Sequence, residues 1–304
     1  MRWNRSHLAS TPGRCNKVYP YIHIAGVSTT TYYLMAGLAA LAGYAIAEVT
    51  LRPVLSRWER RLLPLIVEVL AVIGARLLNA ILNPKAYTNG FHVWTLEYRQ
   101  HSLMGGLVLG LLGILVFCLI RKKHPGKILD AFVLPCACGI VILKIGCFLN
   151  GCCAGKKTTL PWGLEFPSNE SMYRVADPMK FFTGGPHLVH PTQLYEILGA
   201  VVALVITLLL KRWLGAGGVA AVFGGVFSIA RWIILPYRLL SYPKYILNTM
   251  YPIFYGSIAA ICFGYAVGSF MARRRKKEES NESTAPAEEV LFEKDAGKEN
   301  SSQN

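Results

Sequence analysis

Seven apolar stretches of about 20 residues each restrict this chain to very few fold classes. They lie at about 29–50, 62–82, 102–120, 129–150, 192–210, 215–235 and 249–271. A helix of this length spans the hydrocarbon core of a bilayer and satisfies its own backbone hydrogen bonds there. The pattern therefore predicts an all-α polytopic membrane protein with about seven transmembrane helices.

The composition supports a membrane protein and argues against a soluble nucleic-acid-binding protein. Of the 304 residues, 53% are hydrophobic and only 16% are charged, whereas about 25% of a typical soluble domain is charged. The net charge is +15, but the basic residues form short clusters between the apolar stretches. Such clusters orient membrane proteins in the bilayer. We therefore expect membrane lipids as partners, and no nucleic acid.

Four basic clusters predict how the chain is oriented. They occupy residues 52–61, 121–127, 211–212 and 273–277. With seven spans, all four lie on one side of the membrane, and the positive-inside rule makes that side cytoplasmic. The N-terminus is then expected outside and the C-terminus inside.

The segments outside the helices suggest the domain organisation. Residues 1–21 are polar, and residues 22–272 form the predicted membrane domain. Its outer loop, residues 151–191, is too long for a tight helix connection, and long loops are often functional. Residues 273–304 are rich in Glu, Ser, Lys, Asn and Ala, which predicts a disordered, charged cytoplasmic tail.

Charged residues inside the predicted helices are the first indication of a site. They are Glu68, Arg76, Lys144, Glu196 and Arg231. A charge within the membrane costs several kcal/mol, so it normally faces the bundle interior and has a partner. Glu68 and Arg76 lie eight residues apart on one helical face, which also allows a purely structural ion pair.

Lys144 and Arg231 differ because no carboxylate lies close to either of them in the sequence. Their depths in the fourth and sixth predicted helices are similar, so we expect both to converge on one cavity in the outer half of the membrane. Two cations suit an anionic ligand, and a phospholipid phosphate is the anion found at that depth. Arginine binds phosphate oxygens through a planar fork, and lysine binds them as a point charge.

A glycine-rich segment, residues 146–155, follows Lys144. Asn150, Gly151 and Gly155 allow a tight backbone turn whose N–H groups form an anion-binding nest. The alternative is a simple helix C-cap, for which glycine is the usual residue. Considered alone, the segment favours the C-cap.

A second polar segment, residues 190–196, opens the fifth predicted helix, since proline favours a first helical turn. It supplies His190, Gln193, Tyr195 and Glu196 at the lipid–water boundary. This cluster of polar groups is denser than expected for a lone solvated histidine at the membrane interface.

These motifs resemble the prolipoprotein diacylglyceryl transferase family of bacteria. HPTQLYE at 190–196 is similar to the family segment H-P-[ST]-Q-L-Y-E, and KIGCFLNGCCAGKKT at 144–158 with LPWGLEFP at 160–167 resembles the family signature and the segment after it. GAR at 74–76 and SLMGG at 102–106 resemble motifs of the second and third helices. Tyr32 and Arg231 also fall at family positions.

The resemblance implies transfer of the diacylglyceryl group of phosphatidylglycerol to the lipobox cysteine thiol of a preprolipoprotein. It implies a bacterial cell membrane location, with the active site toward the outer face, and neither cofactor nor metal. The partners would be phosphatidylglycerol and preprolipoprotein signal peptides. Arg231 and Lys144 would act on the phosphate. The substrate-binding residues would be Tyr32, Arg76, Gly105, Gly106, Asn150, Gly151, Gly155, Gln193, Tyr195 and Glu196.

Several positions depart from the family pattern. Lys144 replaces the signature arginine, Cys147 and Cys152 replace an asparagine and a glutamate, and Phe227 replaces a tyrosine. Met104 replaces the family histidine and cannot act as a base, so His190 and His101 are the candidate bases.

Two other functions stay open at this stage. The first is a non-catalytic lipid-binding paralogue with the same fold. The second is a thiol-redox or metal protein built on Cys147, Cys152 and Cys153 with His190, although C-x4-C-C is not a common zinc or redox spacing.

Overall fold

A computed structural model describes residues 21–24, 27–82, 84, 101–166, 188–240 and 242–301. The predicted polar segment 1–21 lies outside these residues except for Tyr21, and so does the middle of the predicted outer loop, residues 167–187.

Seven long helices account for most of the described chain. They are α1 (Thr31–Thr50), α2 (Arg57–Leu82), α3 (Leu103–Arg121), α4 (Pro125–Leu149), α6 (Thr192–Leu210), α7 (Gly218–Ile234) and α8 (Tyr251–Ser301). Within the described ranges, seven helices are long and apolar enough to cross a membrane. The predicted fold class is therefore confirmed, and each predicted stretch overlaps one helix.

Short elements extend or connect these helices. Lys211–Trp213 (η5) and Leu235–Tyr237 (η6) are 3-10 turns, and Ile246–Met250 (η7) is a π-helical turn before α8. Two antiparallel hairpins were not predicted: β1 (Tyr21–Ile24) with β2 (Val27–Thr30), and β3 (Leu164–Glu165) with β4 (Leu188–Val189). The second hairpin joins the two described ends of the predicted outer loop.

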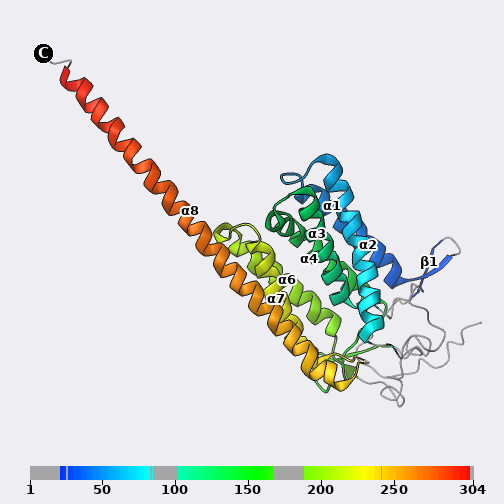
Figure 1. Cartoon of the computed structure of the whole chain (residues 1–304). Helices are drawn as coiled ribbons and strands as arrows, with labels where there is room; N and C mark the ends of the chain where they lie inside the picture. The colour runs from blue at the N-terminus through cyan, green and yellow to red at the C-terminus, as the bar shows by residue number, and fades with distance from the viewer. Residues whose placement is uncertain are drawn as a thin grey trace, which may run out of the picture.

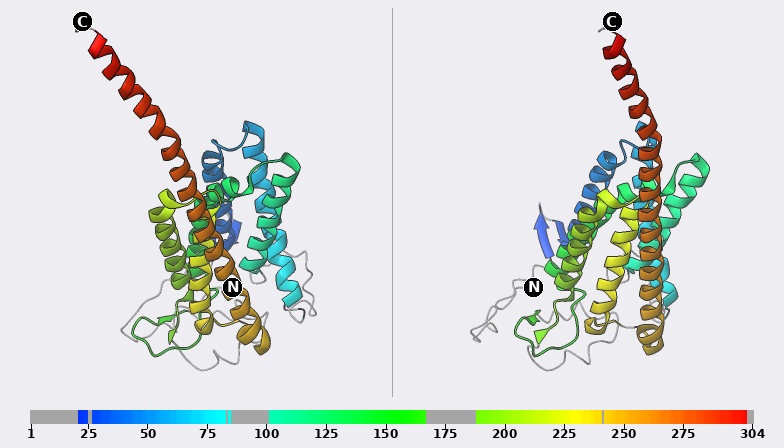
Figure 2. Two further views of the ribbon diagram at one scale, coloured as in Figure 1. Left: turned by 60° about the vertical axis from the view of Figure 1, so that its left-hand side comes forward. Right: turned by 90° about the vertical axis from the view of Figure 1, so that its left-hand side faces the viewer.

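The helices form two groups that meet at α4. In one group α2 packs on α3 and α1 packs on α4, while in the other α7 packs between α6 and α8. Helix α4 also contacts α6 and α7. Figures 1 and 2 show α8 lying along α7 and then extending well beyond the bundle.

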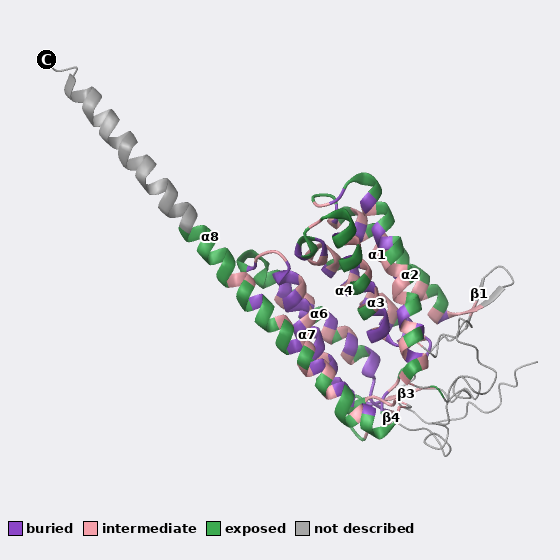
Figure 3. Cartoon of the chain, in the orientation of Figure 1, coloured by how far each residue is buried: buried purple, intermediate pink, exposed green. Residues whose placement is uncertain are grey.

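The outer surface of the bundle is apolar. Leu119 is 78% exposed and Ile261 is 71% exposed, and Figure 3 shows exposed residues along the outward faces of the helices. Large apolar surfaces are rarely left in contact with water. This surface is therefore suited to lipid acyl chains.

Helices α2 and α3 touch backbone to backbone at Gly74 and Gly105. A Cβ atom on either glycine would overlap the other residue's carbonyl oxygen, and a Cβ on Gly106 would lie 2.9 Å from the Ala71 carbonyl oxygen. Small residues allow this kind of close approach between membrane helices. Packing therefore accounts for Gly105 and Gly106, and their predicted role in substrate binding stays a prediction.

The four basic clusters lie at one end of the bundle, as predicted. Glu59 at the start of α2 binds Arg121, the last residue of α3, at 2.9 Å and Lys123, just after that helix, at 3.4 Å. Arg273 of α8 donates to the Leu214 carbonyl just after η5, at 2.7 Å. Gly217 N donates to Asp130 of α4 at 2.7 Å, which connects the two groups at this end. We call this the basic end of the bundle.

The backbone of α8 is helical to Ser301, beyond the apolar part of the helix. The segment after Lys277 contains many Ala, Glu and Lys residues, which have high helix propensity. The disordered cytoplasmic tail expected over residues 273–304 stays a prediction.

Candidate functional site

Glu196, in the first turns of α6, lies at the centre of a buried cluster of charges. Its carboxylate lies 2.5 Å from Lys144 Nζ of α4 and 2.7 Å from Arg231 Nη1 of α7. A third cation, Arg238, approaches the same carboxylate with its Nε at 3.2 Å. Three segments far apart in the sequence therefore meet at one carboxylate. We call these four residues the Glu196 cluster.

The cluster brings Lys144 and Arg231 together, as expected, near the ends of α4 and α7 that lie away from the basic end. A shared cavity in the outer half of the membrane stays a prediction. No carboxylate lies close to either cation in the sequence, but Glu196 contacts both in the structure. This contact could not be read from the sequence, because Glu196 is distant from both cations and sequence does not fix the rotation of α6 about its axis.

Arg238 is a site residue that the sequence analysis missed. It follows η6, outside any helix, and its side chain is 14% exposed. The one sequence feature that could have pointed to Arg238 was its position as a lone arginine beyond α7, at the end opposite the basic clusters. With Lys144 and Arg231 it gives the cluster three cations and one carboxylate, an excess of two positive charges.

Aromatic rings from α8 pack against the α7 side of the cluster. Arg231 Nη2 donates to Tyr255 Oη at 3.4 Å, and Tyr255 is fully buried. The Tyr255 ring stands 5.7 Å from that of Tyr251, which is 5.9 Å from that of Tyr242. Asn79 of α2 donates to the Tyr242 hydroxyl at 3.1 Å. These contacts exclude water around Arg231 and strengthen its electrostatic interactions.

The glycine-rich segment after Lys144 forms a helix C-cap. Gly151 has φ 71°, the left-handed conformation that favours glycine. Gly151 N donates to Phe148 O at 3.0 Å and Cys152 N donates to Cys147 O at 3.0 Å. This is the Schellman pattern of a helix end. The N–H groups of Asn150 and Gly151 both donate within this helix end, so the predicted anion nest does not form at these two residues.

Hydrogen bonds tie the loop after this cap to the segments that carry Glu196 and Arg238. Gly155 N donates to His190 O at 2.8 Å, and Lys156 N donates to Tyr237 O at 2.8 Å. A Cβ on Gly155 would lie 2.5 Å from the Tyr237 carbonyl oxygen, so the close approach requires glycine. Gly155 thus shapes the site by bringing its three segments together.

His190 and Tyr195 form a polar group beside this loop. His190 Nδ1 lies 3.3 Å from Tyr195 Oη, and Trp162 Nε1 donates to the same hydroxyl at 2.9 Å. The His190 ring also packs on Tyr237, with 4.9 Å between centroids. Burial lowers the pKa of His190 below its usual range. The imidazole is therefore neutral near pH 7 and able to accept a proton.

Two buried amide side chains retain unused hydrogen-bonding capacity. Asn150 is fully buried, and neither its Oδ1 nor its Nδ2 has a partner among the described residues. Gln193 Nε2 donates to Cys152 O at 2.6 Å, while its buried Oε1 has no such partner. Unpaired buried polar groups are costly. A bound polar ligand would satisfy them.

The remaining predicted residues lie on α1, α2 and the start of α3. Tyr32 lies near the start of α1, within electrostatic range of Cys147 in the last turn of α4 and of Cys152 and Cys153 beyond it. Arg76 is buried on α2, and His101 precedes α3 where Ser102 N donates to Ala75 O at 2.9 Å. Their roles in the reaction stay predictions.

Glu68 faces α1, since a Cβ on Gly43 would lie 3.5 Å from its Oε1. No ion pair between Glu68 and Arg76 occurs in the described part of the chain. The two residues are about 12 Å apart along the helix axis, too far for direct contact.

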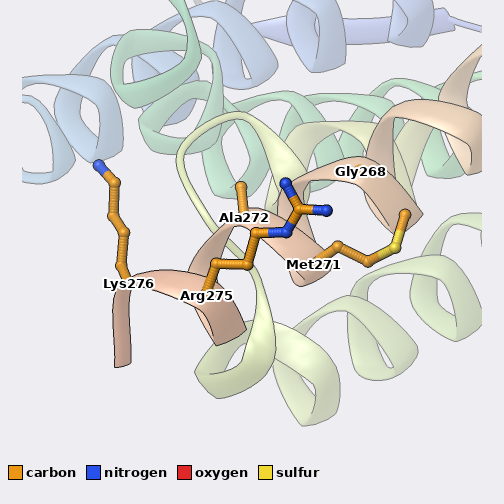
Figure 4. Close-up of a pocket in the computed structure, with 5 residues that line it drawn as sticks. All are labelled: Gly268, Met271, Ala272, Arg275 and Lys276. Carbon is orange, nitrogen blue, oxygen red and sulfur yellow. The ribbon is translucent and has the colours of Figure 1, made fainter. Parts of the chain in front are cut away.

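A depression on the surface of α8 is separate from this site. Figure 4 shows that the residues lining it, Gly268, Met271, Ala272, Arg275 and Lys276, all come from one helix. Gly268 is 13 residues beyond Tyr255, about 20 Å along the helix. It contributes nothing to the Glu196 cluster.

Fold and site together define a class: a seven-helix membrane protein with a buried, net positive charge cluster at one end of its bundle. The chain belongs to the prolipoprotein diacylglyceryl transferase family, whose model matches residues 20–266.

Three similar proteins carry the name phosphatidylglycerol–prolipoprotein diacylglyceryl transferase. The protein of Tropheryma whipplei (strain Twist) is 29% identical over 175 residues, which are 55% of this chain and 61% of that protein. The protein of Synechococcus sp. (strain CC9902) is 31% identical over 184 residues, 57% of this chain and 61% of that protein. The protein of Campylobacter jejuni (strain RM1221) is 32% identical over 160 residues, which are 52% of this chain and 51% of that protein. The chain thus spans less than two thirds of the relatives it matches.

Proposed function

We propose that this protein transfers the diacylglyceryl group of phosphatidylglycerol to the lipobox cysteine thiol of a preprolipoprotein. Family membership supports the reaction, and the names of the relatives support both substrates. The observation that carries the proposal is the Glu196 cluster, which holds two positive charges in excess inside a membrane protein.

The charge of the cluster suits the product better than the substrate. Phosphatidylglycerol is a phosphodiester with one negative charge, and the glycerol phosphate that leaves is a monoester with a charge of about −1.5 to −2 at pH 7. Negative charge therefore grows on the phosphate as the reaction proceeds. Interactions that strengthen in the transition state accelerate the chemical step. Arg231, Lys144 and Arg238 supply them here.

The reaction breaks one bond and forms another. The substrate thiolate attacks the glyceryl carbon that bears the phosphate, a C–S bond forms, and the C–O bond to the phosphate breaks. The electron pair of that bond leaves with glycerol 1-phosphate. The thiol proton must first be removed, and His190 is the proposed acceptor because it is neutral, half enclosed by aromatic rings and close to the cluster's segments. His101 is the second candidate base.

Glu196 acts in this proposal as a positioning residue. Three cations brought together in a low-dielectric interior would repel one another. The carboxylate holds them at 2.5 to 3.2 Å before the lipid binds. Asn150 and Gln193 offer their unpaired buried atoms to the headgroup, and Tyr195 supports His190.

The proposed location is the bacterial cell membrane, with the site toward its outer face. The four basic clusters lie at the opposite end of the bundle from the Glu196 cluster, and the positive-inside rule assigns such clusters to the cytoplasm. Signal peptides of exported lipoproteins reach the outer face, where the proposed site would meet them.

Complementation in a bacterium depleted of its own transferase tests the function. The wild-type chain is expected to restore growth and lipidation of a tagged lipoprotein, whereas Arg231→Ala is not. Trp58→Ala, which changes an exposed side chain at the basic end, is the matched control and should complement. Failure of the wild-type chain at normal expression, with phosphatidylglycerol still bound by the purified protein, would instead favour a non-catalytic lipid-binding paralogue.

A further inference from the structure

Three cysteine sulfurs gather at the end of α4, and the proposed transfer reaction does not use them. The Sγ atoms of Cys147, Cys152 and Cys153 all lie within 4.8 Å of one another. Cys147 belongs to the last turn of α4 and is buried, Cys152 is half-buried, and Cys153 is exposed. We call them the cysteine triad.

The C-cap of α4 creates this arrangement. Because the chain reverses at Gly151, the two cysteines that follow fold back over the last turn of the helix, where Cys147 lies. A C-x4-C-C spacing is not a usual metal motif, and only this turn makes the three sulfurs neighbours.

The triad is held in place from α6. Gln193 Nε2 donates to Cys152 O at 2.6 Å, and Thr192 Oγ1 donates to Cys153 O at 2.7 Å. Cys153 has φ 63°, a left-handed conformation that is uncommon outside glycine and persists only where its surroundings enforce it. These hydrogen bonds fix the backbone that carries Cys152 and Cys153.

We propose that the cysteine triad is a binding site for a soft, thiophilic metal ion, with Cu(I) as the expected occupant. Sulfur ligands bind such an ion at about 2.3 Å, which places three of them about 4 Å apart. That spacing is compatible with the 4.8 Å limit here. Thiolates select soft ions such as Cu(I). Within the described residues the group contains no fourth His, Cys, Asp or Glu ligand, which favours an ion that accepts three sulfurs.

The surroundings of the cysteine triad can offset the charge of a filled metal site and leave a route for the ion to enter. Three thiolates around Cu(I) carry two negative charges in excess, and Lys144 and Arg238 act electrostatically on Cys153. These cations offset the charge of the filled site. The exposed Cys153 provides the entry path that a metal site requires. A disulfide is a weaker account of the triad, because it would pair two thiols and leave the third unused.

Metal titration of the purified full-length protein in detergent tests the proposal without any measurement of transferase activity. The protein is reduced, stripped of metal and titrated anaerobically with Cu(I) against a chromophoric Cu(I) chelator. We expect one equivalent of Cu(I) to transfer to the protein, with a near-ultraviolet thiolate-to-Cu(I) absorption band. An excess of Zn(II) should not displace it.

Single serine substitutions locate the site. Cys147→Ser, Cys152→Ser and Cys153→Ser should each weaken Cu(I) binding at least about 100-fold, since loss even of an outer hydrogen-bond partner weakens metal sites about 10- to 100-fold. The matched control is Cys262→Ser on α8, which should bind like the wild type. Because Cys153 is exposed, its variant should fold, and a thermal melting curve verifies this.

Three results would overturn the proposal. They are no uptake of Cu(I) by the wild type, wild-type affinity in folded Cys153→Ser, and equal loss in Cys262→Ser. A reduced protein that binds no metal but forms a Cys147–Cys152 disulfide on air oxidation would assign the triad to redox chemistry instead.

Discussion

Arg231 Nη1 lies 2.7 Å from the Glu196 carboxylate, and both side chains are at most 4% exposed. An ion pair this deeply buried is held by its partners, and removing one of them leaves a charge that nothing offsets. The pair joins α7 to the first turns of α6 and fixes the position of the guanidinium before any lipid arrives. Its disruption should therefore affect both stability and activity.

Glu196→Gln is expected to destabilise the protein by about 3 to 5 kcal/mol, the usual loss when one partner of a buried pair is removed. Three cations would then face one another without a carboxylate. Thermal unfolding in detergent provides the measurement. Glu48→Gln is the matched control, because Glu48 pairs with Arg60 and Arg61 at longer distances in a more exposed setting, where such pairs contribute about 0 to 1 kcal/mol. Equal melting temperatures for the two variants would contradict the assignment of Glu196.

Arg238→Gln should reduce the rate with little change in stability. The side chain is more exposed than its two neighbours and follows a helix end. A hydrogen bond to a charged group contributes about 1.5 to 3 kcal/mol, which corresponds to a rate loss of roughly 10- to 150-fold. Lys244, an exposed lysine that follows in the sequence, provides the control, and Lys244→Gln should react like the wild type. A variant of Arg238 with the wild-type rate would remove this residue from the phosphate site.

Lys144→Arg should keep activity, because the family has arginine at this position and the charge is retained. Lys144→Met removes the charge and should abolish most of the activity. The initial rate of diacylglyceryl transfer to a lipobox peptide distinguishes the two. If Lys144→Met were as active as the wild type, the cation at this position would not contribute to phosphate binding.

The rate should fall at acid pH through protonation of His190. Burial lowers the pKa of this residue below its usual range, so the imidazole stays neutral at pH 7 and becomes charged only as the pH falls through that lowered value. Above it the base is available, and below it the base is lost. His190→Gln should be slower by about 100- to 10,000-fold, the usual contribution of a general base, and should lack this acid limb. An unchanged pH profile in His190→Gln would assign the role of general base to His101. The matched control is the same substitution at His124, an exposed residue at the basic end.

Gly105→Ala should destabilise the contact between α2 and α3. Alanine in a helix is usually more stable than glycine by about 0.5 to 1 kcal/mol, but a Cβ on Gly105 overlaps the Gly74 carbonyl. Overpacking of this kind costs about 1 to 3 kcal/mol. Gly139→Ala on α4 is the control, since a Cβ there meets no atom within 4 Å. The two melting temperatures should shift in opposite directions, and parallel shifts would refute the packing role.

Much of the fold could be predicted because the bilayer constrains each spanning helix. Its thickness sets the length of the helix, and its apolar core sets the composition. Six of the seven apolar stretches matched a helix within a few residues, while the seventh matched only the start of α8, which continues to Ser301. The depths of Lys144 and Arg231 predicted their convergence. The counter-ion could not be predicted, since Glu196 reaches them only through the rotation and packing of α6. Arg238 was missed because it lies beyond a helix end, where a single basic residue has no periodic pattern.

The turn after α4, residues 150–155, shows the same limit of sequence-based prediction over a shorter stretch of chain. Its glycines were compatible with either an anion-binding nest or a helix C-cap. The hydrogen bonds donated by Gly151 N and Cys152 N show that it is a C-cap. The unusual cysteine spacing argued against a metal site, yet the reversal at Gly151 brings the three sulfurs together. Sequence spacing is a poor guide where a tight turn sets the distance.

Direct observation of the transfer tests the central claim. The purified protein is placed in vesicles that contain phosphatidylglycerol, a lipobox peptide is added, and mass spectrometry measures the peptide and the released glycerol phosphate. We expect a diacylglyceryl thioether on the peptide cysteine with an equal amount of glycerol 1-phosphate, both lost in Arg231→Ala. Wild-type protein that folds and binds phosphatidylglycerol but forms neither product, or Arg231→Ala that forms both at the wild-type rate, would contradict it.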